Sequence, residues 1–467
     1  MADTTAVPGS WAELLGRDYG RATTVLAGGV ALYAINEFIT MSLLPSVVAD
    51  IGGARLYAWV TTVYLVASVV SATTVGPVLA RFGPRLSYLG ALLFFAGGTA
   101  VCAAAPSMAA LLAGRLIQGL AGGVLAGLGY AVISAALPER LWTRAAAVVS
   151  AMWGVGTLIG PASGGVFAQF GLWRWGFGVL MFAALLMAAL VPIALPARGG
   201  STEHRVRIPV RSLVLLGVAA LLVSVAALPR NPAITVGLLV SAAVVVAVFV
   251  VVDRGSAAHV LPRMTFEPGP LKWIYLTMGL LMAATMVDMY APLFGQRLGA
   301  LPPAAAGFLG AALSVGWTVA EIRSASIADR RVAARVVRWS PAVMAAGLGL
   351  AALAIRDGAG PVAIAALGLA LAISGVGIGA AWPHLSVWAM GSVEGGSTDD
   401  AAERAVAAAA INTVQLMCAA FGAGVAGVVV NVRAEPDAPA AQWLFAVFAG
   451  MAAVGWLASS RAAREPR

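Results

Sequence analysis

The stretch 156-GTLIGPASGG-165 decides how this chain folds, because it sets four glycines and a proline in an apolar segment long enough to cross a bilayer. In a helix exposed to water, glycine costs roughly 1 kcal/mol relative to alanine and proline about 3 kcal/mol. In a membrane the same residues let two helix backbones approach closely, and neighbouring helices satisfy the carbonyl that proline frees. The stretch therefore predicts a kinked, closely packed transmembrane helix.

The composition predicts a polytopic membrane protein. Of 467 residues, 61% are hydrophobic and 10% are charged, and the mean hydropathy is +0.91, whereas soluble proteins carry about 25% charged residues. The net charge of +9 lies in short loops, where the positive-inside rule explains it better than a nucleic-acid partner does. The two cysteines, Cys102 and Cys418, lie far apart and the histidines show no metal-ligand spacing, so we expect no disulfide, metal or other cofactor.

Apolar segments of about 20 residues, the length that crosses a bilayer, recur along the chain. They predict fourteen transmembrane helices at 22–48, 57–79, 86–105, 107–137, 144–170, 173–195, 212–228, 232–252, 271–295, 304–326, 336–356, 361–390, 401–431 and 439–459. With the N-terminus inside, most basic residues fall on the cytoplasmic side, so we expect both termini to be cytoplasmic.

These spans group into six, two and six. We expect an N-terminal tail at 1–21, a six-helix bundle at 22–195, a basic cytoplasmic loop at 196–211, two extra helices at 212–252, a cytoplasmic linker at 253–270, a second six-helix bundle at 271–459 and a cytoplasmic tail at 460–467. Residues 43–60 and 290–310 both run from a proline-containing helix end through glycines into the next span. This favours the duplicated halves of a transporter, although two apolar segments can also be similar by chance.

The glycine-proline stretch resembles the antiporter motif GxxxGPxxGG on the fifth helix of major facilitator drug exporters. The matching residues are Gly156, Gly160, Pro161, Gly164 and Gly165. Three further segments resemble family motifs at the expected places: the helix 2–3 loop at 76–85, a helix-four motif at 114–119 and the start of helix six at 173–177. The chain thus resembles the major facilitator superfamily, in its drug:proton antiporter branch with fourteen transmembrane helices. The resemblance implies an all-α major facilitator fold of two six-helix bundles with two extra helices between them.

In that family the helix 2–3 loop holds the two halves together through charge pairs. Its matching positions are Gly76, Arg81, Gly83 and Arg85, whereas Ala80 stands where the family carries an acid. A degenerate second copy at 327–335 keeps Asp329 and Arg330. We expect a weakened latch in the first half unless Asp329 replaces the missing acid, and a generic basic turn is the alternative.

Arg115 lies about 12 Å into the membrane by the helix rise, where insertion of an arginine costs at least about 2.5–3.5 kcal/mol. It therefore needs a partner or a water-filled cavity, and Gln118 shares its helix face. The resemblance implies a role for this arginine in proton transfer. Snorkelling of the side chain to the outer interface is the alternative.

Three of the twenty carboxylates fall inside predicted spans: Glu37, Asp288 and Glu321. A carboxyl group in apolar surroundings exchanges its proton closer to neutral pH than one in water, so these residues and Arg115 are the proton-coupling candidates. Glu37 and Arg115 both fall in the outer half of the bilayer, where they can interact. The alternative is structural salt bridges, with Glu321 pairing to Arg323 or Arg330.

The resemblance also places an acid on helix one about nine residues before its proline. Counted from Pro45, this position is Asn36, one residue before Glu37. Polar and aromatic residues at mid-span are candidates to line the substrate cavity, although each can equally be a packing residue. They are Asn36, Tyr64, Gln118, Trp153, Tyr290, Gln296, Trp317, Asn412 and Gln415.

We expect a non-enzymatic, proton-coupled exporter of hydrophobic or amphiphilic small molecules, of the multidrug-efflux type, working by alternating access. The alternative is a dedicated exporter of one native metabolite, antibiotic or envelope lipid. The expected setting is the bacterial cytoplasmic membrane, as a monomer whose partners are substrate, protons and lipid. A membrane enzyme is disfavoured because the sequence shows no metal-ligand cluster, phosphate-binding loop or nucleophile–base pattern.

Overall fold

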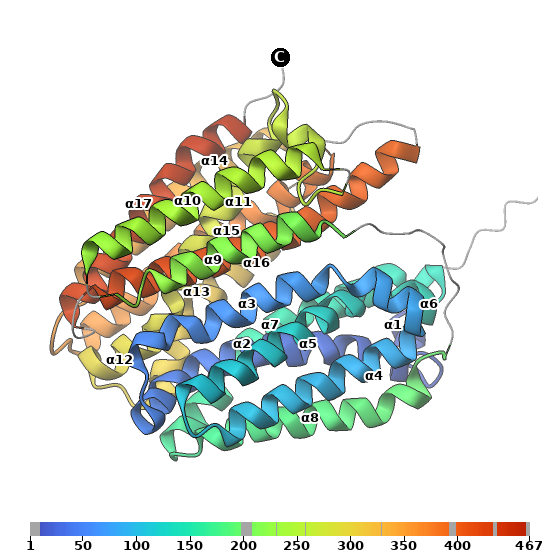
Figure 1. Cartoon of the computed structure of the whole chain (residues 1–467), viewed down its shortest axis with the longest axis horizontal. Coiled ribbons are helices and arrows are strands. Elements are labelled where there is room, and N and C mark those ends of the chain that lie inside the picture. The colour runs from blue at the N-terminus through green and yellow to red at the C-terminus, as the bar shows by residue number, and fades with distance from the viewer. Residues whose placement is uncertain are drawn as a thin grey trace, which may run out of the picture. The chain divides into compact units, whose positions relative to one another are not determined.

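The computed structural model describes residues 10–197, 208–229, 231–256, 258–327, 329–391, 398–432 and 437–463. All regular structure within these ranges is helical (Figure 1). The contacts divide the chain into two compact units. The first is Met1–Val47 with Ala67–Ile208, and the second is Val48–Val66 with Pro209–Arg467. The predicted basic loop at 196–211 and both predicted tails lie partly outside the described residues.

Among the described residues, thirteen helices are long and apolar enough to cross a membrane. A further apolar helix, α9 (Val210–Val225), has 16 residues. At 1.5 Å per residue it is about 24 Å long, shorter than the roughly 30 Å hydrocarbon core. The expectation of an all-α polytopic membrane protein is confirmed.

The first unit is built around long helices that pack through small residues. Its elements are α1 (Trp11–Leu14), most of α2 (Gly20–Ile51), the end of α3 (Tyr57–Ala72), α4 (Val75–Ala104), α5 (Met108–Ala131), α6 (Ile133–Ala136), η2 (Glu139–Leu141), α7 (Trp142–Gln169) and α8 (Trp173–Ala194). Helix α4 packs against α5 and α8. A Cβ atom on Gly98 would lie 2.7 Å from the backbone nitrogen of Gln118, and one on Gly114 would lie 2.9 Å from the Gly98 carbonyl oxygen. The α4 and α5 backbones therefore touch, as small residues allow in membranes.

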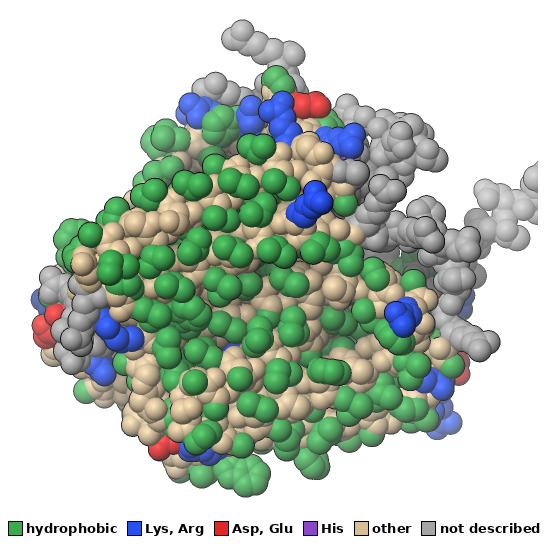
Figure 2. Space-filling view, viewed as in Figure 1, with side chains coloured by type: hydrophobic (Ala, Val, Ile, Leu, Met, Phe, Trp, Pro, Cys, Tyr) green, Lys and Arg blue, Asp and Glu red, His purple; other side chains and the backbone are tan. Residues whose placement is uncertain are grey.

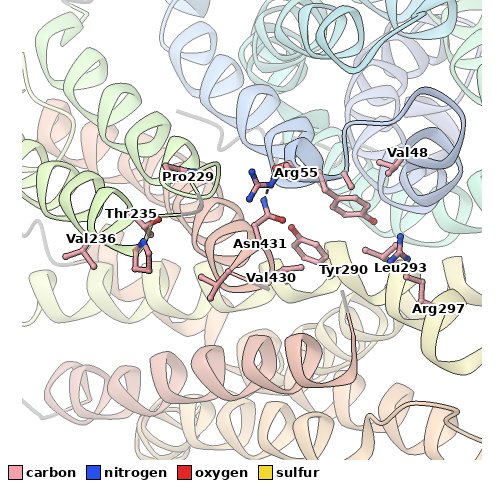
Figure 3. A pocket seen from close by; sticks show the side chains of 14 residues that line it. Val48, Arg55, Pro229, Thr235, Val236, Tyr290, Leu293, Arg297, Val430 and Asn431 are labelled. Atoms are coloured by element: carbon pink, nitrogen blue, oxygen red, sulfur yellow. Dashed lines mark hydrogen bonds between the residues drawn. The ribbon is translucent and has the colours of Figure 1, made fainter. Parts of the chain in front are cut away.

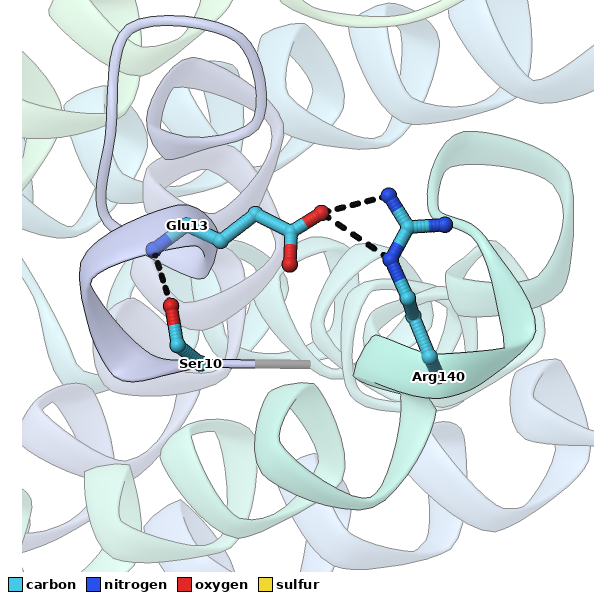
Figure 4. A network of polar contacts seen from close by, with 3 residues as sticks. All are labelled: Ser10, Glu13 and Arg140. Atoms are coloured by element: carbon cyan, nitrogen blue, oxygen red, sulfur yellow. Dashed lines mark hydrogen bonds and ion pairs between the residues drawn. The ribbon is translucent and has the colours of Figure 1, made fainter. Parts of the chain in front are cut away.

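The N-terminal helix α1 is tied to η2 by charge. Ser10 caps α1 by accepting a 3.0 Å hydrogen bond from the Glu13 backbone, and the Glu13 carboxylate accepts from Nε and Nη2 of Arg140 (Figure 4). The hydrogen bond from Arg140 stabilises the charged carboxylate and lowers the pKa of Glu13.

Two helix boundaries in this unit differ from the sequence expectation. The span predicted at 57–79 ends at Ala72, because the Thr73 and Thr74 hydroxyls bond to the Val70 and Ser71 carbonyls at 2.7 Å and α4 begins anew. The apolar residues that continue to position 79 conceal this break. The span predicted at 107–137 also stops early, at the end of α5, and α6 follows as a separate turn.

The second unit holds the remaining helices. They are η1 (Ala54–Leu56), the start of α3, α9, α10 (Pro232–Gly255), η3 (Arg263–Phe266), α11 (Leu271–Thr285), η4 (Met286–Tyr290), α12 (Ala291–Gly299), α13 (Pro303–Ser324), α14 (Arg330–Ala354), α15 (Pro361–Gly391), α16 (Thr398–Asn431) and α17 (Ala438–Ala462). Helix α15 packs against α13 and α14. Side chains at Gly316, Gly375 or Gly379 would overlap the backbone of the facing helix, so this seam too depends on glycine.

The two extra helices pack inside the second unit. Helix α9 lies against α10 and α16 (Figure 1), and Trp59 of α3 donates a 2.9 Å hydrogen bond to the Ser224 carbonyl of α9. Asn431 at the end of α16 donates to the Ala227 carbonyl at 3.2 Å. Figure 2 shows hydrophobic side chains covering these helices, as expected of surfaces that face lipid.

The span predicted at 271–295 is also not one continuous α-helix. The segment η4 is a buried 3₁₀ stretch between α11 and α12, and it holds Asp288 and Tyr290. A 3₁₀ stretch inside a longer helix often marks a hinge. The apolar pattern gave no sign of it, because the residues on both sides are equally apolar.

Candidate transport site

Arg115 is the largest fully buried side chain of the chain's described residues, with 1% of its surface exposed. It lies on the buried face of α5, within one turn of Gln118. Its Nη1 atom donates a 2.9 Å hydrogen bond to Gln118 Oε1 and a 3.3 Å hydrogen bond to Thr40 Oγ1 of α2. The guanidinium group is thus held by neighbouring helices inside the unit, so snorkelling does not describe its position.

Gln118 connects three helices. Its Nε2 atom donates to Asn36 Oδ1 of α2 at 3.1 Å and to Thr99 Oγ1 of α4 at 2.9 Å. The Cys102 thiol approaches Gln118 Oε1 at 3.5 Å. Because α4 and α5 touch at glycines, these short side chains reach Gln118 directly. The cluster of Asn36, Thr40, Thr99, Arg115 and Gln118 is called the α2–α5 polar cluster below.

Glu37 follows Asn36 on α2 and is 8% exposed. Its expected interaction with Arg115 stays a prediction, because the hydrogen bonds described for Arg115 run to Gln118 and Thr40. Asn36 and Thr40 are four residues apart and share a helix face, whereas Glu37 lies about 100° around the helix from Asn36. The position that the family resemblance marks therefore holds a neutral amide within the polar cluster, and the acid stands beside it.

The glycine-proline stretch packs α7 directly on α2. A Cβ atom on Gly156 would lie 2.6 Å from Ala34 Cβ, and one on Gly160 would lie 2.5 Å from Phe38 Cβ. One on Gly164 would lie 2.8 Å from the Ile39 carbonyl oxygen. Pro161 lies inside α7, and Gly165 follows Gly164. This α7–α2 seam runs along the part of α2 that carries Asn36, Glu37 and Thr40, so it fixes where those side chains stand.

The expected helix 2–3 loop motif covers the first residues of α4 and a kink inside that helix at Gly83. Gly83 adopts φ +73°, a left-handed conformation that favours glycine, and Arg85 Nε donates to the Leu195 carbonyl at 3.0 Å. Arg81 is exposed and lies over the Phe82 ring at 5.4 Å, and Gly76 is also exposed near the start of α4.

The second copy of this motif starts α14. Asp329 caps that helix by accepting from the Arg331 and Val332 backbones at 2.7 and 3.3 Å, and Arg330 is exposed. Asp329 therefore has a local structural role. That it also takes over the role of the acid missing at position 80, where Ala80 stands, stays a prediction.

In the second unit Asp288 is 4% exposed and lies in the 3₁₀ segment η4. Tyr290, two residues on, stacks on Tyr57 with ring centroids 4.8 Å apart. The Tyr57 hydroxyl donates to the Met289 carbonyl at 3.1 Å. The interrupted helix is therefore held from the side by the start of α3.

Glu321 accepts a 2.8 Å hydrogen bond from Trp317 Nε1, one turn earlier on α13. The Trp317 ring lies 5.5 Å from the Trp382 ring of α15. The hydrogen bond thus comes from an aromatic residue, and Arg323 and Arg330, the partners considered from sequence, are both exposed. Ser324 and His384 form a second polar contact at 2.9 Å, which the sequence pattern did not indicate.

The remaining cavity candidates are spread over both units. Tyr64 is fully buried, and Trp153 packs edge-on against Tyr33 at 5.5 Å. On α16, Asn412 is exposed and Gln415 is half-buried, and the Gln296 Nε2 atom is buried without a hydrogen-bond partner in the structure. Thr40, Thr99 and Cys102 were not predicted, and only Thr40 had a signal, its spacing of four residues from Asn36.

Apolar helices long enough to cross a membrane that hold buried charged residues in polar contacts are typical of polytopic membrane transport proteins. A family model described as "Major Facilitator Superfamily" matches residues 26–423. The chain therefore belongs to the major facilitator superfamily, and as a transporter of that family it is not an enzyme.

The relatives agree with this assignment. A "probable multidrug-efflux transporter" of Mycobacterium tuberculosis is 59% identical over 477 residues, which cover 100% of this chain and 99% of the relative. The multidrug efflux pump SdrM of Staphylococcus aureus is 27% identical over 61% of this chain and 64% of its own length. Among solved structures, the nucleoside transporter NupG superposes with a TM-score of 0.66 at 14% identity, over 96% of this chain and 100% of that one, which shows the shared fold.

Proposed function

We propose that this chain is a proton-coupled exporter of hydrophobic or amphiphilic small molecules, of the multidrug-efflux type, working by alternating access. The observation that carries the proposal is the α2–α5 polar cluster, in which a fully buried arginine is hydrogen-bonded to neutral side chains and Glu37 directly follows Asn36 of the cluster along α2. The full-length similarity to a probable multidrug-efflux transporter supports the cargo class.

In this mechanism Glu37 and Asp288 take up protons from the outside. While Glu37 is ionised, its charge compensates that of Arg115, and a charge in hydrocarbon surroundings needs such compensation. Protonation removes the attraction and leaves Arg115 with the neutral oxygens of Thr40 and Gln118. The resulting change in the balance of forces on α2 favours the inward-open arrangement, and substrate then displaces the proton.

The same proposal includes a bacterial cytoplasmic membrane location, cytoplasmic termini and a monomeric state. The excess of basic residues in the predicted inner loops supports the orientation. Within the described residues, no group of three or more histidine, cysteine, aspartate or glutamate side chains is placed to hold a metal ion.

Transport by the purified full-length chain in liposomes tests the proposal. We expect uptake of a lipophilic cation such as ethidium into inside-acidic liposomes, with little uptake when both sides share one pH. Glu37→Gln and Asp288→Asn should each reduce gradient-driven uptake at least tenfold, and Glu321→Gln tests the third candidate. Glu267→Gln, at an exposed loop position, is the matched control. Flux that ignores the pH gradient contradicts proton coupling.

A further inference from the structure

A cavity of about 690 Å³ opens in the second unit where several helix ends meet. Its walls come from η1, the turn between α9 and α10, the segment η4–α12 and the end of α16 (Figure 3). This volume lies in the range of about 300–1,000 Å³ that is usual for small-molecule sites. None of the four proton-coupling candidates lines it.

The charged side chains that line this cavity are basic. Arg55 and Arg297 contribute to its walls, and its described lining includes no carboxylate. Figure 3 shows the two arginines on either side of Tyr290. Asn431 donates a 2.9 Å hydrogen bond to the Arg55 carbonyl, so the backbone that carries Arg55 is fixed to the end of α16. An anionic group fits this pair, because arginine binds phosphate and carboxylate oxygens through charge-assisted hydrogen bonds.

A buried hydroxyl group stands beside these charges. Tyr290 is 1% exposed, and its hydroxyl has no hydrogen-bond partner in the structure, whereas the stacked Tyr57 hydroxyl bonds to the Met289 carbonyl. Buried polar groups in proteins are nearly always hydrogen-bonded. The Tyr290 hydroxyl is therefore an unused donor in the wall of the cavity.

The opposite flank of the cavity is apolar and continuous with a surface that faces lipid. Val236 of α10 lines the cavity and is 57% exposed. Val240 and Val244, one and two turns further along α10, are 57% and 56% exposed. These valines recur every four residues on one helix face, so an acyl chain can follow them from the cavity into the hydrocarbon.

We propose that this cavity binds an anionic phospholipid of the surrounding leaflet. Its phosphate groups contact Arg55 and Arg297, and an acyl chain lies along Val236, Val240 and Val244. Helix α10, the second of the two extra helices, thus supplies the lipid-facing side of the site. This inference does not depend on proton coupling, and it assigns Tyr290, a candidate for the substrate cavity, to the lipid site.

Native mass spectrometry of the full chain, released from nanodiscs that contain equal amounts of phosphatidylglycerol and phosphatidylcholine, tests the site. We expect phosphatidylglycerol to remain bound preferentially. The double variant Arg55→Gln/Arg297→Gln should lower its affinity at least tenfold, and Tyr290→Phe should lower it about threefold. Val236→Trp, which obstructs the apolar flank and keeps both charges, should also weaken binding.

Arg356→Gln is the matched control, because Arg356 is an exposed arginine in the turn between α14 and α15 that does not line the cavity. It should change the affinity less than twofold. Equal retention of the two lipids, or an equal loss in the control and double variants, overturns the proposal. So does competition by millimolar inorganic phosphate that displaces the lipid fully, since this identifies a site for free anions. Each variant is compared by its melting temperature, so that misfolding is not read as lost binding.

Discussion

At the residue scale, the hydrogen bonds of Arg115 depend on the length of its side chain. Its Nη1 atom serves Gln118 and Thr40 on different helices, and a lysine ammonium on a shorter reach does not reproduce that arrangement. We predict that Arg115→Lys and Gln118→Leu each reduce gradient-driven transport at least tenfold, while Arg263→Lys at the exposed start of η3 leaves it unchanged. Initial uptake rates in liposomes, normalised to the amount of folded protein, are the measurement. Full activity in Arg115→Lys would mean that charge alone suffices there.

A second residue-scale prediction concerns the contact between Glu13 and Arg140, which lies outside the membrane spans. Arg140 lowers the pKa of Glu13 in the folded chain, so the contact contributes stability above the unfolded pKa of about 4.3. That contribution is lost as the pH falls through the lower, folded pKa. We predict faster hydrogen exchange of α1, after correction for intrinsic rates, at pH 3 than at pH 6.

Glu13→Gln should give the same loosening already at pH 6, because it removes the charge that Arg140 binds. The control is Asp18→Asn, since Asp18 is exposed nearby. Exchange of α1 that is identical in the wild type and in Glu13→Gln would show that the contact does not hold this helix.

At the element scale, the α7–α2 seam makes a prediction with an internal control. A Cβ atom on Gly160 would lie 2.5 Å from Phe38 Cβ, whereas one on Gly154 of the same helix meets nothing within 4 Å. Forcing extra volume into a packed interface costs about 1–3 kcal/mol, and in a unit of this size each kcal/mol shifts the melting temperature by about 2–4 °C. We predict that Gly160→Ala lowers the melting temperature by about 2–12 °C and reduces transport, because α2 carries Glu37.

Gly154→Ala should leave the melting temperature unchanged or raise it slightly, since alanine is the better helix former. Differential scanning fluorimetry of the two variants side by side makes the comparison. Equal melting temperatures would mean that α2 and α7 separate without cost at this point.

The sequence predicted some helices of this structure better than others. Membrane helices follow from apolar length, so thirteen spans and the shorter α9 were foreseen. The seam at Gly156, Gly160 and Gly164 was foreseen as close packing, because only small residues permit it. The break at η4 was not, since a 3₁₀ turn changes hydrogen bonding without changing hydropathy.

The candidate site was predicted in part for the same reason. Arg115 and Glu37 are conspicuous in an apolar sequence, whereas Thr99 and Cys102 reach Gln118 only because α4 and α5 touch. The contact between α4 and α5 joins residues of different helices, so it leaves no periodic pattern in the sequence. In the same way, the sequence predicts that Glu321 lies within a membrane span but does not indicate that Trp317 is its hydrogen-bond donor.

At the scale of the whole molecule, deleting the two extra helices α9 and α10 shows whether they contribute to stability without setting the membrane topology. The pair is predicted to enter and leave on the same side of the membrane, so replacing residues 209–256 by a short glycine-serine linker should keep a C-terminal reporter on the side it occupies in the wild type. Stability should nevertheless fall. The deletion removes the hydrogen bonds from Trp59 to Ser224 and from Asn431 to Ala227, at about 0.6 kcal/mol each in membranes, together with the packing of α9 on α16. We therefore expect the melting temperature to fall by at least about 3 °C, given about 2–4 °C per kcal/mol. A single variant, Trp59→Phe, removes one of these hydrogen bonds without touching Asn431, which also bonds to the Arg55 carbonyl, and should show part of that loss. An unchanged melting temperature in the deletion would show that α9 rests on the unit without stabilising it, and a displaced reporter would show that the pair helps to set the orientation of the helices that follow.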